Sequence, residues 1–299
     1  MKLKLAYFGS PDFSARFLEK ILTDNDLKKL ISVEFVVTQP DKPAGRKQIL
    51  TPTPVKQSAK KHSLEVFEIE NLKTEDSLKI ENLKLKIKTS DLCLVYAYSL
   101  IISKDLLDLP KYGFWCIHPS LLPKYRGTSP IATALINGDK ETGVTIFKMD
   151  EKIDHGPIIA QEKIEILPQD MRPDLEKKLT DLAFNLFKKT ILVKDSLCFQ
   201  PQKHNLATYS KLLKKQDGFI DFENLKLKIK NSPEELYNLF RGLYPWPGIW
   251  TILPNGKRLK ITGMNFNHQN SILNITYVQL EGKKQVDFNT FNKAYKVFS

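Results

Sequence analysis

The sequence predicts an α/β protein in which a doubly wound sheet comes first and a small β-rich part of barrel type follows. Residues 4–9 are predicted as a strand, residues 13–22 carry apolar side chains at helical spacing, and Val33–Thr38 is an uninterrupted apolar strand. Strand, helix and strand in succession are typical of a doubly wound sheet. Beyond residues 199–206, short alternating strands with turn signals such as Pro254-Asn255-Gly256 replace this pattern.

The remaining elements are predicted from apolar periodicity, capping residues and prolines. We expect Ser10 or Asp12 to cap the first helix, and Ser232 to cap a later one. The segment Gln39–Pro54 contains four prolines, and we expect it to be a long loop without helix or strand that presents Arg46. Further helices are expected over residues 55–61, 73–90, 130–136, 174–193 and 233–242, and further strands over residues 63–67, 92–96, 143–149 and 158–166.

Two sequence features carry less information. The first strand and helix do not form a dinucleotide-binding fingerprint, because the required Gly-x-Gly-x-x-Gly is missing. The eight residues Glu81–Lys88 recur letter for letter at Glu223–Lys230, and we attribute this recurrence to low complexity rather than to a structural repeat.

Length and charge suggest two domains with different partners. The change of pattern divides the 299 residues into a domain at 1–195, a linker at 196–205 and a second domain at 206–299. Residues 203–299 hold 15 Lys and Arg against 7 Asp and Glu, so they carry +8 of the net charge of +12. Such an excess favours a polyanionic partner, although a general bias toward lysine explains it equally well.

Other classes of protein are excluded. The sequence has no apolar run of about 18 residues, so we expect no membrane-spanning helix. The N-terminal stretch is too short and too alternating for a signal peptide. Three cysteines at unrelated spacings indicate neither a disulfide framework nor a zinc site, so we expect no metal and a cytoplasmic location.

Candidate chemistry centres on His118. Pro119 and Pro123 prevent a helix after this histidine, so it is predicted to lie where a strand opens into a rigid loop. Asp154 follows the predicted strand at residues 143–149 and could complete a His–Asp pair. The same residues are also consistent with a hydrogen-bonded core histidine at 118 and a plain turn at residues 154–156. The catalytic and the structural interpretation therefore both stay open.

Several motifs together resemble the methionyl-tRNA formyltransferase family over nearly the whole chain. The central motif is His118-Pro-Ser-Leu-Leu-Pro-Lys-Tyr-Arg-Gly127. The others are Phe8-Gly-Ser-Pro-Asp-Phe13, Thr38-Gln-Pro-Asp-Lys-Pro-Ala-Gly-Arg46, Thr51-Pro-Thr-Pro-Val-Lys56, Ala97-Tyr-Ser-Leu-Ile101, Glu141-Thr-Gly-Val-Thr145, Asp154-His-Gly-Pro157, Asp217-Gly-Phe-Ile-Asp221 and Pro245-Trp-Pro-Gly248. The central motif, which begins at His118, is shared by formyltetrahydrofolate-using enzymes. The loop ending at Arg46 and the Pro-Trp-Pro-Gly motif distinguish the tRNA enzyme.

This resemblance implies a Rossmann-like catalytic domain, an OB-like C-terminal barrel and formyl transfer from 10-formyltetrahydrofolate to the α-amine of initiator methionyl-tRNA. It also implies a monomeric enzyme in which His118 and Asp154 are catalytic. By the same resemblance, the folate site would be formed by Tyr98, Ser99, Leu100, Ile101, Ser120, Leu121, Leu122, Pro123 and Asp150. Contacts with tRNA would come from Arg46, Lys47, Lys211, Lys214 and Lys215.

The sequence departs from the family pattern at Cys116, where the family has an asparagine whose amide donates to the developing oxyanion. A thiol is a weak donor, and removing an oxyanion donor typically costs about 10²–10³ in rate. The enzyme is then slow, or Cys116 substitutes as a poor donor or redox-sensitive thiol, or the chain is a silent tRNA- or folate-binding protein. A covalent role for the thiol ranks last. Within enzymes, the alternative acceptor is a nucleotide sugar. Lesser departures are His155, Ser99 and residues 47–49.

Overall fold

The computed structural model describes residues 1–45, 47–71, 75–99 and 102–298. The chain folds into two compact units. The N-terminal unit consists of residues 1–126, 143–164 and 177–208, and the C-terminal unit consists of residues 127–142, 165–176 and 209–299. The division into domains at 1–195 and 206–299 stays a prediction.

The N-terminal unit contains the predicted doubly wound sheet. Its seven strands have the order β10-β9-β7-β6-β1-β2-β5. Neighbouring strands from β5 to β7 are parallel, and β9 runs antiparallel to β7. Their bounds are β1 (Leu3–Phe8), β2 (Ile31–Thr38), β5 (Glu65–Glu68), β6 (Leu92–Val95), β7 (Phe114–His118), β9 (Glu141–Lys148) and β10 (Ile158–Glu165). The carboxyl ends of the parallel strands therefore meet at one edge, where α/β proteins bind ligands.

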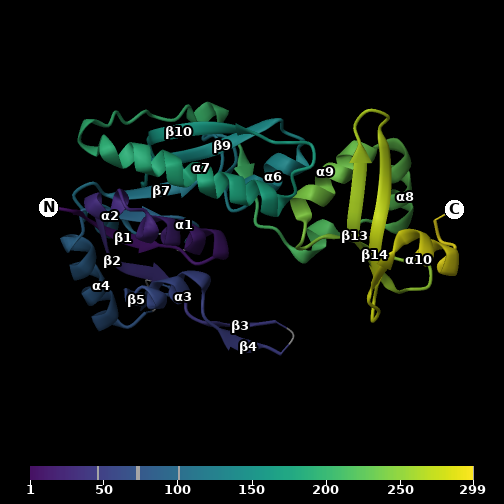
Figure 1. The fold of residues 1–299 in the computed structure, drawn as a ribbon, viewed down its shortest axis with the longest axis horizontal. Coiled ribbons are helices and arrows are strands. Elements are labelled where there is room, and N and C mark those ends of the chain that lie inside the picture. The colour runs from purple at the N-terminus through teal and green to yellow at the C-terminus, as the bar shows by residue number, and fades with distance from the viewer. Residues whose placement is uncertain (46, 72–74, 100–101, 299) are drawn as a thin grey trace. The chain divides into compact units, whose positions relative to one another are not determined.

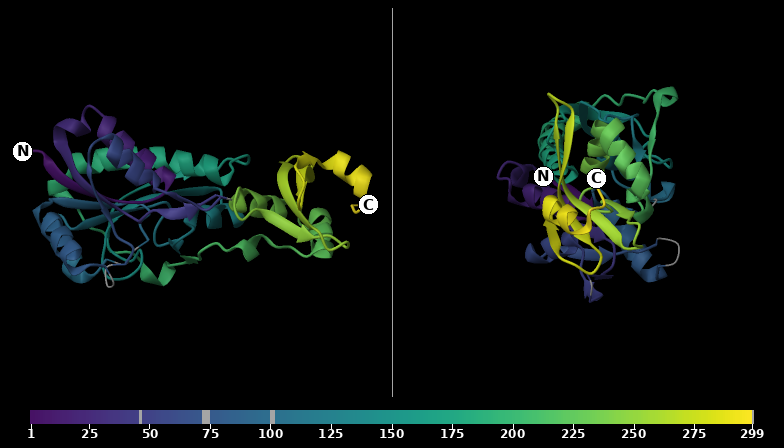
Figure 2. Two further views of the ribbon diagram at one scale, coloured as in Figure 1. Left: turned by 90° about the horizontal axis from the view of Figure 1, so that it is seen from below. Right: turned by 90° about the vertical axis from the view of Figure 1, so that its right-hand side faces the viewer.

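Helices cover both faces of this sheet (Figures 1 and 2). On one face the ring of Tyr7 stacks on Phe17, which meets Phe187 edge-on. On the other face Leu83 and Ile87 pack against Phe8 and Val95 within a single hydrophobic cluster. The helices of the first face are α1 (Asp12–Thr23), α3 (Pro54–Lys61) and α7 (Arg172–Leu192); α4 (Ser77–Thr89) and α5 (Lys104–Leu107) cover the second, and α2 (Leu27–Leu30) leads into β2.

The expectation of a plain loop between Gln39 and Pro54 is wrong. This segment contains a β-hairpin, in which β3 (Lys42–Ala44) pairs antiparallel with β4 (Ile49–Thr51). Its prolines do not prevent pairing, because in a two-stranded ribbon each strand has an outer edge where a missing N–H costs nothing. Arg46 lies outside the described residues.

The base of this hairpin is anchored by Lys56. Its ammonium nitrogen lies 2.6 Å from Asp41 Oδ1 and 2.7 Å from Glu68 Oε1, and the residue is buried. Hydrogen bonds with Asp41 and then with Glu68 raise the pKa of Lys56 above its ordinary value. The hairpin therefore projects from a fixed base.

The predicted caps are also corrected. The N-cap of α1 is Pro11, and neither Ser10 nor Asp12 caps the helix. The Ser10 hydroxyl instead accepts hydrogen bonds from the Gln39 N–H and from Thr38 Oγ1, which join the β1–α1 turn to the end of β2. Ser232 stands at the N-cap of α9, but its side chain makes no cap bond.

The C-terminal unit contains the predicted antiparallel sheet, of order β12-β13-β14-β15. A turn at Gly256, with φ of +78°, joins its first two strands, and Phe219 extends the sheet by one parallel bridge to Trp250. Elements of this unit are α6 (Pro130–Ile136), α8 (Phe222–Asn231), α9 (Pro233–Leu243), β12 (Ile249–Ile252), β13 (Arg258–Asn267), β14 (Ile272–Leu280), β15 (Gln285–Asp287) and α10 (Phe288–Tyr295). A further two-stranded ladder joins β8 (Arg126–Gly127) to β11 (Tyr209–Ser210).

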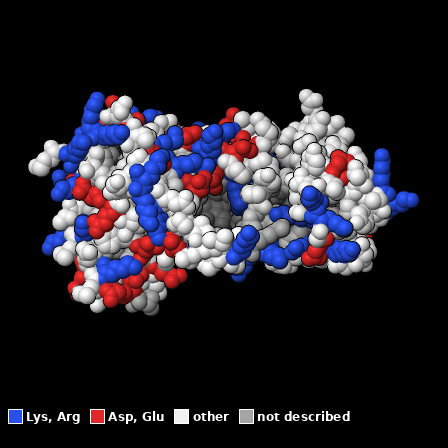
Figure 3. All heavy atoms as spheres, turned by 60° about the horizontal axis from the view of Figure 1, so that its bottom comes forward, with Lys and Arg blue, Asp and Glu red and all other residues white. Residues whose placement is uncertain are grey.

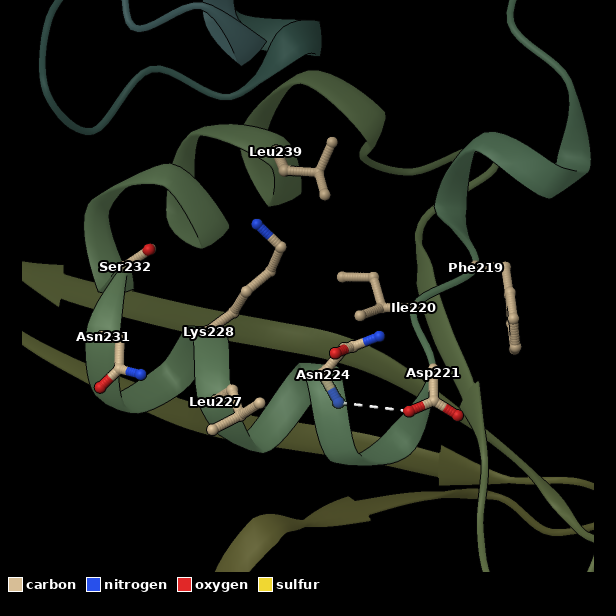
Figure 4. Close-up of a pocket in the computed structure, with 9 residues that line it drawn as sticks. All are labelled: Phe219, Ile220, Asp221, Asn224, Leu227, Lys228, Asn231, Ser232 and Leu239. Carbon is tan, nitrogen blue, oxygen red and sulfur yellow. Dashed lines mark hydrogen bonds between the residues drawn. The ribbon is translucent and has the colours of Figure 1, made fainter.

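Figure 4 shows a pocket of this unit, of about 480 Å³, lined by α8, α9 and the segment before α8. The Asn224 N–H donates to Asp221 at its rim. None of the predicted site residues lines this pocket, so it is separate from the candidate active site.

Candidate active site

His118 is the last residue of β7, at the carboxyl edge of the parallel strands. Its side chain is buried, and its Nε2 lies 2.9 Å from the carbonyl oxygen of Tyr125. Because a carbonyl can only accept, Nε2 carries the proton, and Nδ1 of the neutral ring has a lone pair. The hydrogen bond of Nε2 therefore fixes the orientation of the ring, and the lone pair of Nδ1 is left to accept a proton.

The basic side faces Asp154. The distance from His118 Nδ1 to Asp154 Oδ2 is 3.6 Å, and the Asp154 side chain is only 14% exposed. This separation is too long for a hydrogen bond, but it places a half-enclosed carboxylate directly beside Nδ1. The fold thus brings together the His–Asp pair that the sequence suggested.

Cys116 lies two residues before His118 on β7, so the two side chains share one face of the strand. Burial raises the pKa of the Cys116 thiol well above its ordinary value, and the negative charge of Asp154 adds to this effect. The thiol therefore stays protonated, which disfavours the covalent role, because the thiolate is the nucleophile.

The Pro-Ser-Leu-Leu-Pro turn after His118 is held by two side chains of neighbouring strands. Thr145 Oγ1 donates to the Ser120 carbonyl at 2.7 Å and accepts from the Leu122 N–H at 3.1 Å. Gln161 donates to the Leu122 carbonyl and to Thr145 Oγ1. The backbone of this turn is thus rigid. Leu121 and Pro123 are half-buried, whereas Ser120 and Leu122 are buried.

The other predicted folate residues follow β6 and β9. Tyr98 is half-buried, and its hydroxyl donates to the Ile69 carbonyl at 3.3 Å. Ser99 is exposed, while Leu100 and Ile101 lie outside the described residues. Asp150 accepts a hydrogen bond of 2.6 Å from His155 Nδ1. Tyr98 follows β6, and His118 ends the adjacent parallel strand β7, so the loops after these two strands leave the same edge of the sheet.

The sequence did not single out a group of polar residues near Asp154. The His155 and His204 rings stack with their centroids 4.0 Å apart and their planes 2° from parallel. Arg126 Nη2 donates to His204 Nδ1 at 2.8 Å, and Arg126 also donates to Gln202. Arg126 and His155 stood in recognised motifs, whereas nothing in the spacing of residues 202 and 204 points to the site.

We expect the free energy of unfolding to fall more steeply with decreasing pH in the unmodified protein than in a variant that lacks His204. Desolvation lowers the pKa of His204, and the positive charges of its neighbours, His155 and Arg126 first, act in the same direction. The unfolded chain therefore takes up this proton first, and stability is lost as pH falls below about 6.5, the ordinary pKa of histidine. The measurement is the urea midpoint at pH 7.5 and 5.5 for the unmodified protein and His204→Gln. Equal losses in both would contradict the prediction.

The four predicted tRNA contacts among the described residues lie on the surface. Lys47 is exposed in the hairpin, and Lys211, Lys214 and Lys215 are exposed in the segment before α8. Lys211 forms an ion pair of 2.9 Å with Asp217, and the ammonium of Lys215 lies over the Trp250 ring. On the face that Figure 3 shows, Lys and Arg are interspersed with Asp and Glu. The role of the predicted contact residues in tRNA binding stays a prediction.

The described residues contain neither a candidate metal site nor a candidate membrane-spanning helix. There, no group of three or more His, Cys, Asp or Glu side chains could hold a metal ion. Within the same residues no helix is both long and apolar enough to span a bilayer.

Comparison with known proteins gives the family. Residues 2–191 match the family model described as formyl transferase, and residues 212–272 match the formyl transferase C-terminal domain. A methionyl-tRNA formyltransferase of Caldicellulosiruptor saccharolyticus is 36% identical over 99% of this chain and 98% of its own length. One of Thermotoga neapolitana is 35% identical over 96% of this chain and 93% of its own.

Solved structures share the fold. A sugar N-formyltransferase from a Shewanella species has a TM-score of 0.64 at 17% identity, over 87% of this chain and 97% of its own. A phosphoribosylglycinamide formyltransferase from Bacillus halodurans has a TM-score of 0.53 at 28% identity, over 64% of this chain and 95% of its own. The resemblance that the motifs suggested is confirmed.

Proposed function

The chain belongs to the methionyl-tRNA formyltransferase family, and we propose on that premise that it transfers a formyl group from 10-formyltetrahydrofolate to the α-amine of initiator methionyl-tRNA. The observation that best supports this function is the Nδ1 of His118 facing the Asp154 carboxylate, 3.6 Å away, at the carboxyl edge of the sheet. Amine formylation needs a base at such a position, because the attacking nitrogen must lose a proton.

The reaction then has three steps. The amine nitrogen attacks the formyl carbon, and a tetrahedral intermediate forms with a negative oxygen and a positive nitrogen. His118 Nδ1 takes the proton from that nitrogen, and Asp154 stabilises the resulting imidazolium. The carbon–nitrogen bond to the folate breaks as the leaving nitrogen receives the proton. A positioned general base of this kind contributes about 10²–10⁴ to the rate.

The remaining assignments are part of the same proposal. The loops after β6 and β7 hold the folate, with the turn at Ser120–Pro123 kept rigid by Thr145. The hairpin that Lys56 anchors contacts the acceptor end of the tRNA. The C-terminal unit attracts the acceptor arm through the excess of Lys and Arg in residues 203–299.

The test is single-turnover formylation with three acceptors at equal concentration: initiator methionyl-tRNA, elongator methionyl-tRNA and an amino-sugar nucleotide. We expect initiator tRNA to react fastest, and tRNA binding to weaken steeply as salt rises, because several phosphates are neutralised. Tetrahydrofolate without a formyl group is the control. Faster reaction of the amino-sugar nucleotide would favour the alternative enzyme, and tRNA binding without formylation would indicate a silent binding protein.

A further inference from the structure

Gln202 reaches the catalytic turn through strand pairing. Ile158, the first residue of β10, forms an antiparallel bridge with Gln200, in which each N–H donates to the other carbonyl at 2.8 Å. In an antiparallel register each step back on one strand is a step forward on the other. Gln202 is therefore delivered opposite Gly156, although it follows Asp154 by 48 positions.

The side chain of Gln202 uses both ends of its amide. Nε2 donates to the Asp154 carbonyl at 3.0 Å and to the Gly156 carbonyl at 2.7 Å. Oε1 accepts from Arg126, at 2.7 Å from Nη2 and 3.3 Å from Nε. Gln202 is 6% exposed and Arg126 is 2% exposed. The guanidinium has only donors, so it fixes which end of the amide faces the turn.

The turn that Gln202 holds has an unfavourable backbone conformation. Asp154 has φ of +49°, in the left-handed region that costs energy for a residue with a side chain. Such a conformation persists only where surrounding contacts impose it. Since the Asp154 carboxylate must face His118, rotation of this backbone would move the charge away from the imidazole.

We propose that Gln202, oriented by Arg126, is a positioning residue for Asp154 in the transfer reaction. The inference rests on the proposed function for its kinetic consequence, but the conformational consequence is independent of it. The hydrogen bonds from Gln202 to the turn go to backbone carbonyls, so a change at Gln202 leaves the Asp154 carboxylate in place in the sequence but alters its support.

The kinetic test compares Gln202→Glu with the unmodified protein. Glutamate keeps the acceptor for Arg126 but replaces the two N–H donors with an oxygen that repels both carbonyls. We expect kcat to fall by about 10²-fold, since displacements near 1 Å have such effects, while KM for tRNA and for folate stays within about threefold. Gln200→Glu is the matched control, because it makes the same change at an exposed position of the same segment. It should leave both constants unchanged.

A double-mutant comparison of formylation rates with Asp154 distinguishes a positioning role of Gln202 from a general loss of structure. In an Asp154→Ala background we expect Gln202→Glu to lower the rate no further, because the group it positions is gone. An equal further loss in that background, or a Gln202→Glu enzyme as fast as Gln200→Glu, would overturn the proposal. Gln202→Met, which fills similar space without charge, replaces Gln202→Glu in all measurements if the latter does not fold.

Hydrogen exchange tests the same inference without activity. We expect amides of residues 149–157 to exchange about tenfold faster in the Gln202 variants, with the other strands of the sheet unchanged. Unaltered exchange in this segment would overturn the proposal even in a protein that formylates nothing. If the proposed function is wrong, the unmodified protein is inactive in formylation, but its amides at residues 149–157 are still protected from exchange.

Discussion

Replacing His118 with alanine is expected to lower the single-turnover rate of initiator methionyl-tRNA formylation by about 10²–10⁴-fold, the contribution of a positioned general base. Its Nδ1 faces the Asp154 carboxylate at 3.6 Å, while Nε2 is held by the Tyr125 carbonyl. The rate is measured with saturating enzyme and 10-formyltetrahydrofolate. The affinity for tRNA should be unchanged, because the imidazole is buried.

His62→Ala is the matched control for this change. His62 belongs to the same unit, but its Nε2 contacts Glu19, which links α3 to α1 and not to the site. We expect this variant to keep the full rate. If His118→Ala also kept the full rate while folding normally, His118 would be a core histidine, as one interpretation of the sequence allowed.

Replacing Cys116 with asparagine is expected to raise the same rate by about 10²-fold, the lower end of what one oxyanion donor contributes. The protonated thiol is a weak donor, whereas an amide N–H at this position donates strongly. The Cys116 side chain shares its strand face with His118 and is influenced by the Asp154 charge, so an amide placed there lies beside the reacting atoms.

Cys198→Asn is the control, because it makes the same change at an exposed cysteine. Cys116→Ala should cost little if the thiol contributes little. A slower Cys116→Asn enzyme, together with a large loss in Cys116→Ala, would show that the thiol is itself adapted to the reaction and that the site is not impaired.

Much of the fold was predictable because it depends on local patterns. Apolar strands and helical stripes located the sheet, the covering helices and the antiparallel C-terminal sheet. The repeated octapeptide shows the limit of this approach. It is helical in α4, where a helix was predicted over residues 73–90, and also in α8, where no helix was predicted. Leu83 and Ile87, one turn apart, are buried in α4, so tertiary packing selects the helical period.

The missed hairpin and caps have a related cause. Four prolines predict a loop, but Pro43 is itself paired with Leu50, and the other three flank the paired residues. Pairing depends on β3 meeting β4. Likewise Ser10 has the chemistry of a cap, but its hydroxyl has better-placed donors in Gln39 and Thr38. Local propensity cannot reveal which of several partners a side chain finds.

By itself the sequence determined the kind of sheet and the family, and it proposed His118, Asp154 and Cys116 as site residues, because apolar periodicity and motif residues are local properties. Only the tertiary structure showed that the Nδ1 of His118 faces Asp154, and that Gln202, hydrogen-bonded to Arg126, donates to the backbone of the turn. These relations require β7 to pair with β9 and Ile158 to pair with Gln200. Contacts between distant segments follow from chain topology, which no local pattern encodes.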